Sequence, residues 1–192
     1  MQIDTQLRRQ LIEAMAAVVN AHVRELTELD QAIGDGDHGT GMERGFNAVL
    51  ADVDKLAGQP LSAALTGIGR TLVMSMGGAS GPLYGTFFME LGKTLGDTPD
   101  RAALAASFTR AMGAVAMRGK SEPGQKTLLD VLAPVATALD GIEDAAGIAR
   151  IAAKAAEDTI PMQASRGRAA FLGARSIGHM DPGARSASLI IG

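Results

Sequence analysis

The sequence predicts an all-α fold, an antiparallel up-and-down bundle or barrel of eight helices. Apolar residues recur at helical spacing along almost the whole 192-residue chain, and strand-like alternation is nowhere sustained. Hydrophobic residues make up 46% of the chain but aromatic residues only 3%, and there is no tryptophan. An interior of alanine, leucine and methionine suits close-packed helices better than twisted sheets. The length is typical of one domain, which we expect to span residues 1–192.

Eight segments carry the helical pattern, and glycine or proline separates most of them. Their apolar positions lie in residues 3–26, 46–56, 61–76, 82–95, 104–115, 128–139, 148–159 and 165–176. Short links between them contain Gly58, Pro60, Gly96, Pro99 and Gly141. Such links make consecutive helices antiparallel. Ser188–Ile191 is expected to form a short extended tail.

Four other connections are longer and richer in glycine: residues 33–41, 76–82, 118–127 and 179–184. The first three follow the first, third and fifth predicted helices, so an antiparallel arrangement brings them to one rim. The fourth joins them if the tail turns back. Because glycine permits a positive φ and close backbone approach to a ligand, this rim is the predicted binding site.

Three aspartates, Asp30, Asp35 and Asp37, accompany the first glycine connection, and His38 follows them. Like charges this close need a cation, and oxygen ligands in a chain without cysteine favour a hard ion, Mg²⁺ or Ca²⁺. The spacing lacks the pattern of an EF-hand. Mg²⁺ fills its remaining positions with water and phosphate oxygens, so the aspartates could hold two Mg²⁺ facing a polyphosphate. The alternative is that glycine and aspartate serve only as turn formers.

The second glycine connection, "GGASG" at 77–81, precedes Pro82, which suits the first turn of a helix. Backbone N–H groups at a helix start bind anions, so a phosphate could rest there. A tight packing turn is the alternative. The chain contains no Walker loop, and no strand precedes the glycines as a Rossmann fingerprint requires.

Four motifs occur in order: "GDGDHGTGM", "GGASGPLYGTFF", "GKSEPGQKTLLDVLAPV" and "GRAAFLGARSIGHMDPGARS". Together they resemble the L subunit of dihydroxyacetone kinase, the nucleotide-binding subunit that also occurs as the C-terminal domain of single-chain dihydroxyacetone kinases. The resemblance extends over essentially the whole chain. It implies an eight-helix barrel with a nucleotide and two Mg²⁺ at one rim.

The same resemblance implies roles for individual residues. Asp30, Asp35 and Asp37 would bind Mg²⁺, and Arg168 would meet the moving phosphoryl group, with His38 as a second catalytic candidate. The nucleotide would be bound by His38, Gly39, Thr40, Gly41, Ala79, Ser80, Gly119, Leu128, Arg168, Asp181, Pro182 and Gly183. Two positions depart from the family pattern: Gly41 replaces a frequent asparagine, and Leu128 replaces the usual methionine.

The sequence does not assign an orientation to several basic side chains. Arg166, Arg168, Arg175 and Arg185 are all candidates to face the phosphates. Lys120 and Lys126 flank the third glycine connection, and at least one of them is expected to face solvent. His22 and His179 are interpreted as structural.

The resemblance implies a phosphotransferase subunit that needs a partner, because the ketone is held by a separate K subunit. In one version, ADP stays bound and a phosphohistidine-bearing M subunit of the phosphotransferase system rephosphorylates it, and the short chain favours this version. In the other, ATP exchanges as a substrate and the acceptor is dihydroxyacetone or erythrulose. A non-catalytic Mg-nucleotide sensor docking on a regulator, and the related domain of fatty-acid kinases, are further alternatives.

The formal net charge of −3 predicts no general attraction to nucleic acid or anionic lipid. Residues 1–25 lack a signal-peptide core, and no apolar run approaches the roughly 20 residues that span a bilayer. We therefore expect a cytoplasmic protein without nucleic-acid or membrane partners. A homodimer is also compatible with the sequence.

Overall fold

The computed structural model describes residues 2–192, and every regular element in that range is a helix. The predicted all-α class is therefore confirmed. The chain divides by packing into two compact units, one formed by the residues up to Asn20 with Gly41–Gly119 and the other by Ala21–Thr40 with Lys120–Gly192. Each unit combines stretches that are distant in the sequence, so neither is a contiguous segment.

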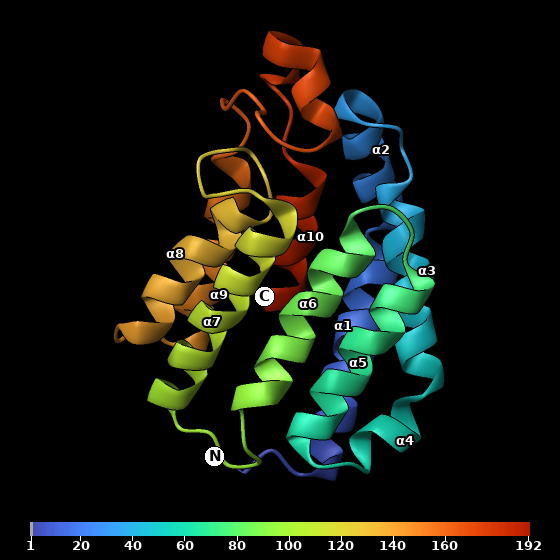
Figure 1. The fold of residues 1–192 in the computed structure, drawn as a ribbon, viewed down its shortest axis with the longest axis vertical. Coiled ribbons are helices and arrows are strands. Elements are labelled where there is room, and N and C mark those ends of the chain that lie inside the picture. Colours follow the sequence, from blue (N-terminus) through green and yellow to red (C-terminus); the bar gives the residue numbers. More distant parts are fainter. Residues whose placement is uncertain (1) are drawn as a thin grey trace. The chain divides into compact units, whose positions relative to one another are not determined.

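The first unit is built around a run of antiparallel helices. Its elements are α1 (Thr5–Ala21, whose last residue belongs to the other unit), α3 (His38–Ala51, from Gly41 onward), α4 (Val53–Ala57), α5 (Leu61–Ser75), α6 (Ser80–Thr94) and α7 (Arg101–Gly119). In Figure 1, α5 and α6 run side by side, and α7 packs on α6. Gly69 and Gly85 face each other at this crossing, where a Cβ on Gly69 would lie 2.6 Å from the Gly85 carbonyl oxygen. Glycine therefore allows the two helices to pack closely.

The second unit holds the acidic connection and the C-terminal third of the chain. Its elements are α2 (Val23–Ile33), the first turn of α3, α8 (Leu129–Asp140), α9 (Ala145–Glu157), the 3₁₀ helix η1 (Arg168–Ser176) and α10 (Pro182–Ile191). A short link joins α8 to α9, and α10 packs against α9, α8 and α2 (Figure 1). This packing brings the C-terminal helix next to the helix that carries Asp30.

Two predicted segments are each divided by a one-residue break. The first is α1 and α2, separated at His22, and the second is α3 and α4, separated at Asp52. At both breaks the backbone has φ near −100° to −116° and ψ near 12–14°, and the i→i−4 bonding resumes at once. These backbone angles deviate so little from a helix that the apolar residues keep their helical spacing, and the spacing therefore does not predict the two breaks.

The first glycine connection is shorter than predicted, because α2 continues to Ile33 and α3 begins at His38. Only residues 34–37 are non-helical. Gly39 lies inside α3, where a Cβ would come within 2.8 Å of the Thr27 backbone nitrogen. Glycine at this position allows close helix packing instead of a turn, so the expectation of a loop over 33–41 is wrong.

The C-terminal region differs from the prediction at two places. Ser188–Ile191 is helical within α10, so the predicted extended tail is wrong; Asp181 as N-cap and Pro182 as N1 start this helix. The eighth predicted helix is the 3₁₀ helix η1, interrupted at Gly173, where φ is 55° and ψ is −128°. This glycine conformation prevents a continuous α-helix.

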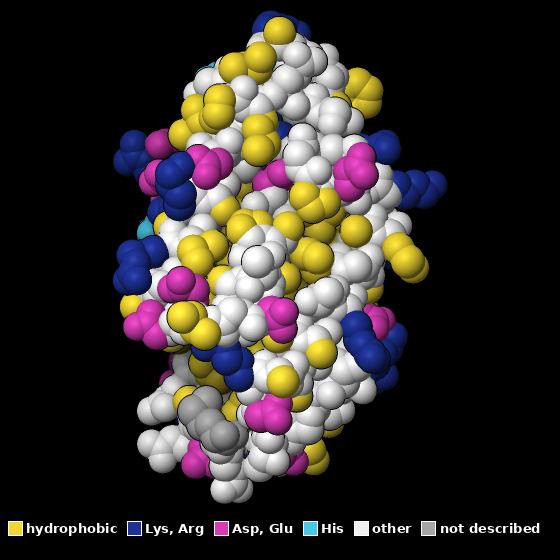
Figure 2. Space-filling model, turned by 90° about the vertical axis from the view of Figure 1, so that its left-hand side faces the viewer, with side chains coloured by type: hydrophobic (Ala, Val, Ile, Leu, Met, Phe, Trp, Pro, Cys, Tyr) yellow, Lys and Arg dark blue, Asp and Glu magenta, His cyan; other side chains and the backbone are white. Residues whose placement is uncertain are grey.

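Charged side chains of both signs are interspersed on the face shown in Figure 2, without a broad basic surface there. Within residues 2–192, none of the helices combines the length and apolar character needed to cross a bilayer.

Candidate functional site

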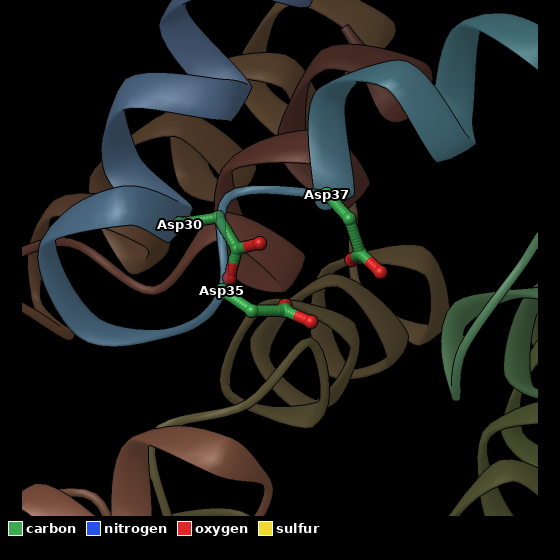
Figure 3. A group of neighbouring side chains, drawn as sticks. All are labelled: Asp30, Asp35 and Asp37. Carbon is green, nitrogen blue, oxygen red and sulfur yellow. The ribbon is translucent and has the colours of Figure 1, made fainter.

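Three carboxylates meet where α2 leads into α3. Asp30 lies in the last turn of α2 and is 8% exposed, while Asp35 and Asp37 lie in the exposed connection. One ligand oxygen from each of the three lies within 4.8 Å of the others. Figure 3 shows the three side chains projecting to the same side of the connection. Three like charges at this separation repel one another, so the donor set fits a hard divalent cation such as Mg²⁺.

Backbone geometry holds this cluster in place. The Asp30 carboxylate accepts a hydrogen bond from the His38 backbone N–H at 3.1 Å, and the Gly34 N–H donates to the Asp30 carbonyl at 2.5 Å. Gly36 has a φ of 77°, which favours glycine and turns the chain between Asp35 and Asp37. Asp30 is thereby oriented before any cation arrives.

His38 is buried and contacts the C-terminal helix. Its Nε2 lies 2.9 Å from the Ser186 hydroxyl of α10. Burial lowers the pKa of His38 to about 4, although Asp30 and the Pro182 backbone act in the opposite direction. The imidazole is therefore neutral near pH 7 and adds no positive charge beside the aspartates.

An arginine from a distant part of the sequence reaches the aspartates. The Arg168 guanidinium forms an ion pair with Asp35, and Gly167, with a φ of 68°, turns the chain just before it. Arg166 and Arg185 bond to other side chains of the same unit. Because the Arg168 side chain is 58% exposed, the pair orients the guanidinium more than it stabilises the fold.

The predicted turn at residues 181–183 begins α10. The Asp181 carboxylate caps this helix by accepting from the Ala184 N–H at 2.7 Å, and burial raises the pKa of Asp181 to about 7. A Cβ on Gly183 would lie 3.8 Å from the Leu128 Cβ, so these two predicted residues are neighbours. The acidic connection, Leu128, Arg168 and this turn all belong to the second unit.

Four predicted nucleotide residues belong to the first unit. The exposed Ala79 and the half-buried Ser80 lie at the start of α6, and Gly78 precedes them with a φ of 64°. Pro82 lies in the first helical turn as predicted. Gly119 is the last residue of α7. A Cβ on Gly41 would meet nothing within 4 Å, so glycine is not required there for packing.

Comparison with known proteins decides the family. The model of the DAK2 domain matches residues 32–192. The chain belongs to the DAK2 domain family. It is 43% identical to the ADP-binding subunit DhaL of the PEP-dependent dihydroxyacetone kinase of Escherichia coli K12, over 84% of this chain and 81% of that protein. It is 41% identical to the corresponding DhaL subunit of kinase 1 of Listeria innocua, over 86% of this chain and 82% of that protein.

A solved structure shows the same DAK2-type fold. The dihydroxyacetone kinase from C. freundii, solved in complex with AMP-PNP and Mg²⁺, superposes with a TM-score of 0.81 at 22% identity. The match covers 100% of this chain and 34% of that one, so this DAK2 chain spans about a third of that kinase.

Sequence reasoning missed three buried polar residues of the second unit, Ser186, Lys126 and Asp130. Ser186 holds the His38 ring, and Lys126, predicted only as a loop residue, is fully buried. Asp130 accepts the Gly124 and Thr127 N–H groups at 2.5 and 2.7 Å. The Thr127-x-x-Asp130 spacing resembles a capping box and was the available signal for Asp130. Lys120 is exposed, which confirms the prediction that at least one of Lys120 and Lys126 faces solvent.

Proposed function

We propose that this chain is the ADP-binding subunit of a dihydroxyacetone kinase. It would transfer a phosphoryl group from a magnesium-bound nucleotide to dihydroxyacetone held on a separate K subunit. The observation that carries the proposal is the meeting of Asp30, Asp35 and Asp37 with Arg168 in one unit. The curated relatives support it, since both are ADP-binding subunits of PEP-dependent dihydroxyacetone kinases.

The three aspartates are the proposed Mg²⁺ ligands. One carboxylate oxygen of each lies within 4.8 Å of the other two, and the His38 N–H orients Asp30 in this cluster. Three carboxylates are enough for two Mg²⁺, each completing its shell with phosphate oxygens and water. When bound, Mg²⁺ neutralises phosphate charge and holds the phosphates in line for transfer.

The protein's own groups would position the phosphates and balance their charge. Arg168 is proposed to leave Asp35 and meet the transferred phosphoryl group, because a guanidinium binds phosphate oxygens with two parallel hydrogen bonds. In the second unit, the N–H groups of residues 38–40 at the start of α3 are the proposed phosphate donors. In the first unit, the sequence-based candidates for the same role are Gly41 and the start of α6 at Ala79 and Ser80. His38, buried and neutral, is proposed to hold the phosphate-binding end of α3 in place. Phosphoryl transfer relies mainly on such positioning.

We propose that ADP stays on the protein and is rephosphorylated there by a phosphohistidine-bearing M subunit. The PEP dependence of both DhaL relatives favours this version over exchanging ATP. In the second unit, Leu128 is the proposed contact for the base and ribose, and it lies beside Gly183 at the start of α10. Gly119 of the first unit is the other residue that the sequence assigns to this role. The proposed setting is the cytoplasm, where the K and M subunits would be the partners.

The decisive experiment is reconstitution. The purified chain, a K subunit and a phosphorylated M subunit are combined with dihydroxyacetone, and dihydroxyacetone phosphate is quantified. Product is expected only when all three proteins are present. Product formation with ATP in place of the M subunit would favour the version in which ATP exchanges as a substrate. A parallel reaction with erythrulose tests which ketose is the acceptor. Activity of the chain alone would contradict the need for a K subunit, and inactivity with every partner would indicate a nucleotide sensor.

A further inference from the structure

The ammonium group of Lys126 lies inside a ring of backbone carbonyls. Lys126 is 1% exposed. Its Nζ lies 2.9 Å from the carbonyl oxygen of Thr159, 3.0 Å from that of Met162 and 2.8 Å from that of Ser176. The carbonyl oxygens of Ile160 and His179 lie at 3.5 and 2.5 Å. Five acceptors thus surround a group that has three N–H donors.

These carbonyls come from both ends of one excursion of the chain. Residues 163–175, called here the Arg168 segment, form the stretch of the second unit between Met162 and Ser176. The two ends are also joined directly, by Gly178 N–H to the Ile160 carbonyl at 2.8 Å and by Ala164 N–H to the Ser176 hydroxyl at 2.9 Å. Lys126 therefore lies at the closed base of the Arg168 segment.

Apart from its base, the Arg168 segment has a small set of anchors. Ala169 and Leu172 pack with Ile33 and Ala164 in a small apolar cluster, whereas Phe171 is 91% exposed. The exposed Arg166 side chain donates to the Gln125 side chain at 3.2 Å, and the Ser165 N–H donates to the Gln125 carbonyl at 3.4 Å, so these two bonds tie the segment to the neighbour of Lys126. Local packing of this size constrains a segment weakly. The position of the exposed Arg168 guanidinium therefore depends largely on the base of the segment, where Lys126 binds both of its ends.

The backbone of Lys126 adopts an unfavourable conformation, and the hydrogen bonds of its side chain hold it there. Its φ is 62°, in the left-handed region that non-glycine residues rarely adopt. Such a conformation persists where surrounding contacts hold it. Removal of the ammonium would leave buried carbonyls without a donor, which is more costly than loss of an exposed hydrogen bond. Lys126 is therefore held by its contacts despite an unfavourable backbone.

We propose that Lys126 is a positioning residue for phosphoryl transfer: by clamping both ends of the Arg168 segment, it keeps the Arg168 guanidinium at the aspartate cluster, from where it can turn from Asp35 to the transferred group. This inference rests on the proposed function, in which Arg168 meets the transferred group. Lys126 contacts no reacting atom and acts through Arg168. A displacement of about 1 Å in a phosphate-binding group is enough to cost up to a hundredfold in rate.

The first test needs no activity. Lys126→Met keeps the apolar stem and removes the ammonium, and Lys120→Met is the matched control in the same loop, also at a left-handed φ of 49° but exposed. Limited trypsin digestion is followed by mass spectrometry. Cleavage after Arg168 and Arg175 should accelerate about tenfold in Lys126→Met and change less than about twofold in Lys120→Met. Cleavage after Arg24 in α2 should stay unchanged.

The second test is a double-mutant cycle in the reconstituted assay. Lys126→Met should lower kcat about tenfold when Arg168 is present, and less than about twofold in an Arg168→Ala background. If the wild-type chain transfers no phosphate, the proposed function fails while the digestion still tests the clamp. If transfer occurs and the two substitutions act additively, the positioning role is overturned.

Two other results would also overturn the proposal. One is equal digestion of Lys126→Met and Lys120→Met, and the other is acceleration at Arg24 as large as at Arg168, which indicates general destabilisation. If Lys126→Met does not fold, Ser176→Ala supplies the comparison. It removes the hydroxyl that accepts from Ala164 at the same base and leaves the ammonium in place. It should accelerate cleavage after Arg168 in the same selective way.

Discussion

The Nε2 atom of His38 lies 2.9 Å from the hydroxyl oxygen of Ser186, which joins the first residue of α3 to the C-terminal helix. Both side chains are buried. The His38 backbone N–H simultaneously binds the Asp30 carboxylate. One residue thus couples the acidic cluster to α10, and the buried hydrogen bond fixes where α3 begins.

Ser186→Ala should lower the free energy of unfolding by about 1–3 kcal/mol, because it deprives a buried imidazole nitrogen of this hydrogen bond. Urea denaturation followed by circular dichroism measures the loss. Ser188→Ala is the matched control: Ser188 is also buried in α10, and like Ser186 it donates to a carbonyl three residues earlier. Equal losses in the two variants would show that the contact with His38 contributes nothing.

Asp35→Asn should weaken binding of Mg-ADP by about 10–100-fold, because it removes one of three charged metal ligands. Helix content should be unchanged, since Asp35 lies in the connection between helices. Isothermal titration calorimetry measures the affinity, with the exposed Asp52→Asn as control. Unaltered Mg-ADP affinity in Asp35→Asn would remove Asp35 from the metal site.

The purified protein should contain ADP in near-stoichiometric amount and retain it through gel filtration in Mg²⁺. Charge-assisted contacts around the diphosphate make its dissociation slow. EDTA should release the nucleotide, because the aspartates then face the phosphates without a bridging cation. Chromatography of the denatured protein quantifies ADP before and after the chelator. Protein that is purified empty and exchanges ATP within seconds would contradict a resident cofactor.

Asp181 should make the fold less stable as pH rises from about 4 to 7. Burial raises the pKa of this carboxyl from 3.8 to about 7, so the folded chain holds a proton that the unfolded chain releases. The stability from this group is full below pH 4 and is lost as pH rises through 7.

Asp181→Asn keeps a capping oxygen and stays neutral. Relative to this variant, the wild-type free energy of unfolding should fall by a few kcal/mol between pH 4 and 8. Urea denaturation across this range measures the difference. Asp144→Asn, at the exposed N-cap of α9, is the control. A pH-independent difference for Asp181→Asn would show that the buried carboxyl is ionised throughout.

The sequence alone determined the helical class and the acidic cluster, because both depend on short-range spacing. Apolar residues three and four positions apart specify a helix wherever they occur, and this predicted nearly every helical segment. Asp30, Asp35 and Asp37 are close in the chain, so one short connection is enough to bring their carboxylates within reach of one cation. The one-residue breaks at His22 and Asp52 left this spacing intact and were missed for that reason.

Tertiary packing alone decided which distant groups join the cluster. Four arginines in residues 166–185 are equivalent by sequence, and the turn of the chain at Gly167 brings Arg168 to Asp35. Lys126 is one of two similar loop lysines, yet it is buried because the carbonyls that bind it come from residues 159–179. Backbone carbonyls are present at every residue and carry no sequence signature, so a site made of them exists only once the chain has folded.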